Sequence, residues 1–178
     1  MKKIVISGGP HSGKTSLIGA LEEKYPAFEY LPEPATVVVS EAQKNDGLYW
    51  RDIFDSSLEF CTLCMNQSVH AESLVDPVSK FVFLDRSLID TIGYARRDGC
   101  EELVPELKEL ARLALYDVVF FCEPVGEIKG RIEDADIAKH THELLEQAYR
   151  EINIALISLP AVGIDERVRI VETVLAIN

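Results

Sequence analysis

A glycine-rich segment near the start of the chain lies between a short apolar run and a stretch of helical character. The apolar run covers residues 3–7, and the helical stretch covers residues 14–24. Between them the sequence matches G-x-x-x-x-G-K-[ST] at every fixed position, with the residues Gly8, Gly9, Pro10, His11, Ser12, Gly13, Lys14 and Thr15, followed by Ser16. Strand, glycine-rich loop and helix are the context of a phosphate-binding loop. The segment therefore predicts an α/β fold whose first loop binds phosphate groups.

The chemistry of such a loop follows from its backbone. Consecutive N–H groups point at one anion, and the first turn of the following helix adds the positive end of its dipole. Lys14 would reach the terminal phosphates, and the Thr15 hydroxyl would help to hold Mg²⁺. A chance glycine turn is the alternative. We expect residues 8–16 to bind a nucleoside triphosphate, with ATP and Mg²⁺ as the ligands.

Length and charge limit the remaining possibilities. The 178 residues are typical of one domain, so we expect a single P-loop domain over residues 1–178. The net charge of −12, from 18 basic and 30 acidic residues, argues against general binding to nucleic acid or to an anionic membrane. No signal-like segment opens the sequence, and no apolar run approaches transmembrane length. We therefore expect a cytoplasmic protein.

Two of the four cysteines, Cys61 and Cys64, have the C-x-x-C spacing. A metal or redox site would need a second pair of ligands or the strand-to-helix turn of a thioredoxin motif, and the sequence has neither. The pair lies inside a helical pattern at residues 51–74. We therefore predict that these cysteines pack in the core.

Five short apolar segments are predicted strands, at residues 3–7, 29–31, 80–84, 117–122 and 155–159. Helical patterns lie at residues 14–24, 35–44, 51–74, 90–97, 105–115, 135–152 and 165–176. Several strands are apolar without alternation, which is typical of strands buried on both faces of a parallel sheet. The alternation of strands and helices predicts such a sheet, with ligands at the carboxyl ends of its strands.

A carboxylate and a guanidinium follow the third predicted strand. Four apolar residues end at Asp85, which is the Walker B pattern, in which the carboxylate holds Mg²⁺ directly or through water. Together with the phosphate-binding loop, this pattern indicates Asp85 and Thr15 as the metal-binding residues. Arg86 is placed to bridge a substrate and the transferred group, with an ordinary salt bridge as the alternative.

A second carboxylate, Glu33, follows the second predicted strand between Pro32 and Pro34. The two prolines restrict the backbone, which suits a group that must be held in position. Glu33 can accept a proton from an attacking hydroxyl or hold a metal-bound water. The alternative is a carboxylate that only stabilises the start of the helix at residues 35–44. We predict Lys14, Glu33, Asp85 and Arg86 as the catalytic group.

Three motifs together resemble one family of P-loop proteins. They are G-G-P-x-S-G-K-T at residues 8–15, P-E-P-A at residues 32–35 and L-D-R-S-L-I-D-T-I-G-Y-A-R at residues 84–96. The chain resembles the AAA-type ATPase domain that the bacterial NAD-biosynthesis regulator contains, where the domain acts as ribosylnicotinamide kinase. It is also similar to deoxynucleoside kinases, in which Glu-Pro follows strand two and Glu/Asp-Arg-Ser follows strand three. The resemblance covers nearly the whole chain.

This resemblance implies a three-layer P-loop NTPase fold with a parallel five-stranded sheet in the order 2-3-1-4-5. It implies that Glu33 is the catalytic base, Arg86 a contact to substrate and phosphate, and Asp85 a metal-linked carboxylate. It also implies a short lid near residues 124–135, with Arg131 on the nucleotide phosphates. That segment is shorter and has fewer arginines than the lids of the family, so a solvated surface arginine is the alternative for Arg131.

The two histidines of the helical pattern at residues 135–152, His140 and His142, lie two positions apart and do not share a helix face. Their acidic neighbours predict that both are solvated.

Three functions are compatible with these observations. The first is a small-molecule kinase that transfers the γ-phosphoryl group of ATP to a hydroxyl of a nucleoside-like acceptor. The second is an ATPase or GTPase, although the guanine signature Asn-Lys-x-Asp is absent and the chain is too short for a ring-forming AAA+ motor. The third is a nucleotide-dependent sensor that acts through a protein partner. A homodimer is compatible with each of them.

Overall fold

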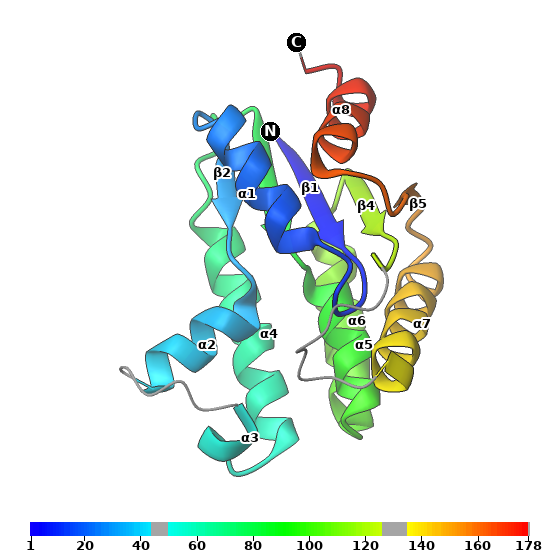
Figure 1. The fold of residues 1–178 in the computed structure, drawn as a ribbon. Coiled ribbons are helices and arrows are strands. Elements are labelled where there is room, and N and C mark those ends of the chain that lie inside the picture. Colours follow the sequence, from blue (N-terminus) through cyan, green and yellow to red (C-terminus); the bar gives the residue numbers. More distant parts are fainter. Residues whose placement is uncertain (44–49, 126–134, 178) are drawn as a thin grey trace.

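A parallel five-stranded sheet in the order β2-β3-β1-β4-β5 forms the centre of the computed structural model (Figure 1). The structure describes residues 1–43, 50–125 and 135–177. The strands are β1 (Lys2–Ser7), β2 (Glu29–Leu31), β3 (Phe81–Asp85), β4 (Val118–Cys122) and β5 (Leu156–Leu159). This order confirms the expected 2-3-1-4-5 arrangement, and the strand ends lie within one residue of those predicted from the apolar runs.

Helices cover both faces of the sheet and complete three layers (Figure 1). On one face lie α1 (Lys14–Lys24) and α8 (Ile164–Leu175). The other face is covered by α4 (Ser57–Ser73), α5 (Leu88–Arg97), α6 (Val104–Ala114) and α7 (Ala135–Glu151). The helix α2 (Pro34–Gln43) packs against α4 and α3 (Trp50–Ile53), and a 3₁₀ turn, Glu101–Leu103, precedes α6.

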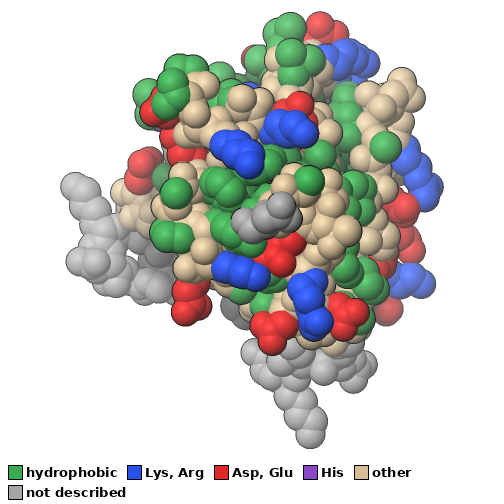
Figure 2. All heavy atoms as spheres, turned by 90° about the horizontal axis from the view of Figure 1, so that it is seen from above, with side chains coloured by type: hydrophobic (Ala, Val, Ile, Leu, Met, Phe, Trp, Pro, Cys, Tyr) green, Lys and Arg blue, Asp and Glu red, His purple; other side chains and the backbone are tan. Residues whose placement is uncertain are grey.

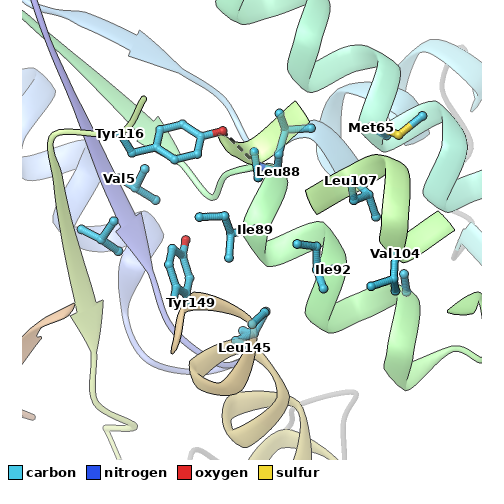
Figure 3. Packing of buried hydrophobic residues seen from close by; sticks show 14 of the residues in the cluster. Val5, Met65, Leu88, Ile89, Ile92, Val104, Leu107, Tyr116, Leu145 and Tyr149 are labelled. Atoms are coloured by element: carbon cyan, nitrogen blue, oxygen red, sulfur yellow. Dashed lines mark hydrogen bonds between the residues drawn. The ribbon is translucent and has the colours of Figure 1, made fainter. Parts of the chain in front are cut away.

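Successive strand residues pack into two different apolar clusters, because side chains alternate across a sheet. Val5, Leu84 and Val119 join the cluster under α4–α7, whereas Ile6, Phe83 and Phe120 join the cluster under α1 and α8. Both clusters are buried, which explains why these strands are apolar without alternation. In the first cluster, Tyr116 and Tyr149 point towards α5, and the Tyr116 hydroxyl accepts a hydrogen bond from the backbone N–H of Leu88 (Figure 3).

The helix predicted at residues 51–74 is divided in the structure into α3 and α4. Ser56 has an extended backbone, and its side chain accepts a hydrogen bond from the N–H of Glu59, so it is the N-cap of α4. The Glu59 carboxylate accepts in turn from the N–H of Asp55. A serine followed by a glutamate three positions later is the sequence signal of a helix start, and the long apolar pattern obscured it.

The helices α5 and α7 approach each other most closely at Gly93. A Cβ atom at this position would lie 2.7 Å from Cδ2 of Leu145 and 3.1 Å from the backbone N and Cα of the same residue. The helices α5 and α7 pack side by side (Figure 1). Gly93 therefore permits a helix separation that a larger residue would not.

The four cysteines are buried as free thiols, so the predicted core role of Cys61 and Cys64 is confirmed. Within the described ranges, none of the helices has the length and apolar character needed to cross a membrane. Figure 2 shows the face on which the strands begin, where hydrophobic side chains lie between basic and acidic ones. That face therefore carries charges of both signs.

Candidate active site

The glycine-rich loop connects the end of β1 to the start of α1, as predicted. Gly8 has φ 133°, and a Cβ atom there would lie 2.5 Å from the carbonyl oxygen of Cys122, so only glycine fits against the end of β4. Helix α1 begins after Gly13 with no side-chain cap and no acidic residue in its first turn. Its first N–H groups therefore suit an anion. Thr15 and Ser16 are exposed at this helix start.

The Lys14 side chain lies buried against the loop. Its Nζ donates hydrogen bonds to the carbonyl oxygen of Gly9, at 2.9 Å, and to Oγ of Ser12, at 3.2 Å. Burial, and secondly the charge of Arg86, lowers the pKa of Lys14 to about 8. A phosphate group next to this ammonium would favour its charged form.

Glu33 and Arg86 form an ion pair between the ends of β2 and β3. Nε of Arg86 donates to Oε1 of Glu33 at 2.5 Å, and the other carboxylate oxygen accepts from the Thr36 hydroxyl at 3.1 Å. Burial alone would raise the pKa of Glu33, but Arg86, and to a smaller extent Lys14 and Thr36, hold it below its usual value. Glu33 is therefore ionised at neutral pH. Its side chain is 30% exposed, with each carboxylate oxygen accepting one hydrogen bond.

Arg86 is held at several points in addition to Glu33. Its backbone has φ 73°, a left-handed conformation that is uncommon for a residue other than glycine. Nη1 donates to the carbonyl oxygen of Gly8 at 3.2 Å and lies 3.6 Å from Oδ1 of Asp90. The guanidinium carbon lies 4.9 Å from the centre of the Tyr94 ring. These contacts fix the guanidinium beside the loop.

Asp85 is buried near the charges of Lys14, Glu33 and Arg86. Among the described residues, its buried Oδ1 atom has no hydrogen-bond partner. Burial, and secondly the charge of Glu33, raises the pKa of Asp85 to about 6. An unpartnered buried carboxylate oxygen beside a phosphate-binding loop fits a cation such as Mg²⁺, for which carboxylate oxygens are the usual protein ligands. Within the described ranges, no group of three His, Cys, Asp or Glu residues could hold a metal by itself.

A buried polar cluster around Asp90 joins this site to the core. The Asp90 carboxylate accepts hydrogen bonds from the hydroxyls of Ser7, at 2.5 Å, and Tyr149, at 2.5 Å, and from the backbone N–H and the hydroxyl of Ser87. Ser87 and Asp90 form a capping box at the start of α5. The cluster therefore fixes α5, and with it Arg86, relative to β1 and α7.

His142 contacts the loop, although its acidic neighbours predict a solvated side chain. Its Nδ1 accepts a hydrogen bond from the N–H of Gly9 at 3.2 Å, and its ring lies 4.7 Å from that of Phe121. Burial lowers the pKa of His142, so the imidazole is neutral and able to accept. The prediction was wrong for His142 because helix spacing cannot show which loop a helix packs against. His140 is exposed, as predicted.

A polar cavity of about 440 Å³ opens between α3, the start of α4 and the end of α5. It is lined by Arg51, Phe54, Asp55, Ser56, Ser57, Arg97 and Asp98. The guanidinium carbon of Arg97 lies 4.6 Å from the centre of the Tyr94 ring, which Arg86 also contacts. The Tyr94 ring thus contacts both Arg97, which lines the cavity, and Arg86, which lies beside the loop.

The structure thus brings Lys14, Glu33, Asp85 and Arg86 together, as the sequence predicts. The predicted lid at residues 124–135, with Arg131, lies mostly outside the described residues, and Arg131 itself lies outside them. Two contributors were not predicted from the sequence. Asp90 carried a weak signal in the D-R-S-x-x-D segment, whereas His142 carried none.

A family model described as an AAA domain matches residues 3–167 of the chain. Among curated proteins, no sequence match is found.

Solved structures with the same fold include two kinds of kinase and the NadR protein. NadR protein in complex with NR has a TM-score of 0.77 at 18% identity, over 99% of this chain and 51% of that one. Deoxyadenosine kinase from M. mycoides has a TM-score of 0.73 at 13% identity, over 98% of both chains. Thymidylate kinase from Candida albicans has a TM-score of 0.66 at 16% identity, over 98% of this chain and 91% of that one. The present chain thus spans about half the length of NadR.

Proposed function

Since the chain belongs to the AAA-domain family, we propose that it is a kinase that transfers the γ-phosphoryl group of ATP to a hydroxyl of a nucleoside-like acceptor. The observation that carries this proposal is the ion pair of Glu33 and Arg86 beside the buried Lys14. It supplies an ionised, partly exposed carboxylate next to a loop suited to phosphate groups. A protein that only binds a nucleotide has no need of such a carboxylate.

The loop would hold the triphosphate through its N–H groups and the start of α1. Lys14 would exchange its contacts with Gly9 and Ser12 for contacts with the terminal phosphates. Because Lys14 is buried, its charge acts on the phosphates with little screening by water. Phosphoryl transfer needs mainly positioning and charge stabilisation, and this arrangement supports both.

Glu33 would accept the proton of the acceptor hydroxyl. Arg86 holds one carboxylate oxygen and keeps the group ionised, and the acceptor hydroxyl would donate to the other oxygen, which now accepts from the Thr36 hydroxyl. The remaining contacts of Arg86 fix the direction of the carboxylate.

Asp85 and Thr15 would hold Mg²⁺ together with the phosphates. When bound, Mg²⁺ would neutralise the charge of the β- and γ-phosphate oxygens. The unpartnered oxygen of Asp85 supports this assignment, and the exposed hydroxyl of Thr15 lies at the start of α1 where the phosphates would be.

The cavity near Tyr94 is of a size that accommodates a small ligand, and its lining has both hydrogen-bond donors and acceptors. We assign it to the acceptor, because Tyr94 connects it to Arg86. The similar structures support this class of acceptor, since NadR is solved with NR and with AMP-PNP, and the deoxyadenosine kinase with dCMP.

The contact between Gly9 and His142 favours a second candidate function, a nucleotide-dependent sensor. A change at the loop on nucleotide binding would reach α7 through this hydrogen bond, and α7 would then present the change to a protein partner.

One experiment separates these functions. Purified protein is incubated with ATP, Mg²⁺ and a panel of nucleosides, and phosphorylated product and free phosphate are measured separately. Product without excess phosphate is the result that we expect. Phosphate alone would indicate an ATPase. Neither, in a protein that binds ATP, would favour the sensor.

A further inference from the structure

A fully buried arginine, Arg167 of α8, lies behind the phosphate loop with 0% exposure. Its guanidinium donates three hydrogen bonds. Nε donates to the carbonyl oxygen of Pro160 at 2.8 Å, Nη2 to that of Glu123 at 3.0 Å, and Nη1 to that of Ser12. The three carbonyl groups follow β5, follow β4 and belong to the loop, so one side chain connects three segments.

All three acceptors are backbone carbonyl groups, which carry no net charge. A buried charge requires compensation, and here hydrogen bonds supply it. An arginine side chain cannot lose its proton in a protein, so these contacts leave its positive charge in place. A structural cross-link between strand ends does not require a charge. A site for phosphate groups, in contrast, is improved by one.

The contact with Ser12 has a direct effect on the loop. The carbonyl of Ser12 and the N–H of Gly13 belong to one planar trans peptide group, so they point in opposite directions. Holding the oxygen against Arg167 directs the N–H away from it. A donor on the carbonyl also polarises the N–H and makes it a stronger donor. Arg167 lies close behind this peptide, since a Cβ on Gly13 would be 3.3 Å from its Nη1.

We propose that Arg167 is a positioning residue of the phosphate loop: it orients the Ser12–Gly13 peptide group towards the phosphates and supplies positive charge from behind. The proposal rests on the nucleotide-binding part of the proposed function and not on phosphoryl transfer. The competing explanation is that Arg167 only joins the ends of β4 and β5 to the loop and affects stability alone.

Binding of inorganic tripolyphosphate and of Mg–ATP to Arg167→Met, Arg167→Lys and Arg169→Met proteins, measured by calorimetry, distinguishes the two. Arg169 is exposed on the same helix and serves as the matched control. We expect Arg167→Met to weaken tripolyphosphate binding by about 10- to 100-fold, because the Gly13 N–H would lose its hydrogen bond to the charged phosphate. Arg167→Lys, which keeps the charge, should recover part of the affinity, and Arg169→Met should bind as the wild type does. Wild-type affinity in a folded Arg167→Met protein would overturn the proposal.

A measurement on the unmodified protein covers the case in which the variants do not fold. In ¹⁵N-labelled wild type, tripolyphosphate should shift the Nε–H resonance of Arg167 and the amide resonance of Gly13, and leave the Nε–H resonance of Arg169 in place. An unchanged Arg167 resonance at saturating tripolyphosphate would refute the proposal. Because neither readout involves an acceptor, a failure of the kinase function would not alter them. Loss of tripolyphosphate binding in the wild type would contradict the phosphate-loop assignment itself.

Discussion

Nε of Arg86, directly after β3, lies 2.5 Å from Oε1 of Glu33, which follows Pro32 at the end of β2. The pair crosses from one strand end to its neighbour, because β2 and β3 are adjacent in the sheet. Arg86 thereby keeps the carboxylate ionised and fixes its direction, while the left-handed backbone of Arg86 aims the guanidinium along the edge of the sheet. This ionised and positioned carboxylate is the feature that favours the proposed kinase over a protein that only binds a nucleotide.

Glu33→Gln should cut transfer to the acceptor by about 10²- to 10⁴-fold, because a positioned general base contributes on this order. The affinity for ATP should be nearly unchanged, since the amide keeps the size of the side chain and can still accept from Arg86. Initial rates of product formation and calorimetric ATP binding measure the two effects.

If Glu33 only stabilises the start of α2, the pattern is reversed. The variant would then lose roughly 0.3–1 kcal/mol of unfolding free energy and keep its activity. A wild-type rate of transfer in Glu33→Gln would remove the main support for a kinase over a sensor.

Lys14→Met should weaken Mg–ATP binding by an order of magnitude or more, because it removes the buried charge and keeps the aliphatic stem. The pKa of Lys14 in the free protein is lowered to about 8, and bound phosphate favours the charged form. ATP binding near pH 8 should therefore take up a proton, and the affinity should fall as the pH rises above 8. Calorimetry in buffers of different ionisation enthalpy detects this uptake. Its persistence in Lys14→Met would assign it to another group.

Asp85→Asn should stabilise the ligand-free protein at pH 8. The pKa of Asp85 is raised to about 6 in the folded state from 3.8, so folding becomes less favourable as the pH rises through this range and the carboxylate ionises. Removing the charge should add on the order of 2–3 kcal/mol at pH 8, and the difference should disappear towards pH 4. Denaturant unfolding at several pH values tests this.

The same variant tests the metal assignment. Mg–ATP should stabilise the wild type more than Asp85→Asn, and turnover should fall in the variant more than nucleotide binding does. Equal stabilisation of the two proteins by Mg–ATP would show that Asp85 does not hold the ion.

His142→Ala should expose the N–H of Gly9 to hydrogen exchange. Loss of one hydrogen bond of about 1 kcal/mol corresponds to roughly fivefold faster exchange of that amide. His140→Ala, on the exposed side of the same helix, should leave it unchanged. Exchange measured by NMR at fixed pH compares the two, and an unaltered Gly9 amide in His142→Ala would mean that the imidazole does not hold the loop.

The limits of the strands were predictable because both faces of the sheet are buried, which makes segments such as residues 118–121 apolar throughout. Their order was implied only by the resemblance to other P-loop proteins. Lys14, Glu33, Asp85 and Arg86 were predictable for a related reason. Each lies at the end of a strand or in the segment that follows one, and the carboxyl ends of parallel strands meet at one edge of a sheet. The break before α4 was missed, although Ser56 and Glu59 carry its signal, because hydrophobic periodicity continues across it.

His142 and Arg167 could not be found in this way. Each contacts the loop from a helix that is distant in sequence. How that helix packs on the sheet decides whether its side chain reaches the loop. A single histidine or arginine on a helix forms no pattern. These two contacts to the loop are thus visible only in three dimensions.

The close approach at Gly93 limits how closely α5 and α7 can approach each other beside the site. Helix α5 starts just after Arg86, and α7 carries both Leu145 and His142. The contact between Gly93 and Leu145 therefore joins the helix that follows the ion pair to the helix whose imidazole binds the loop. A methyl group introduced at residue 93 would push α5 and α7 apart, because it would lie too close to Leu145. Gly93 therefore constrains the distance between α5 and α7, although it contacts neither the ion pair nor the phosphate loop itself.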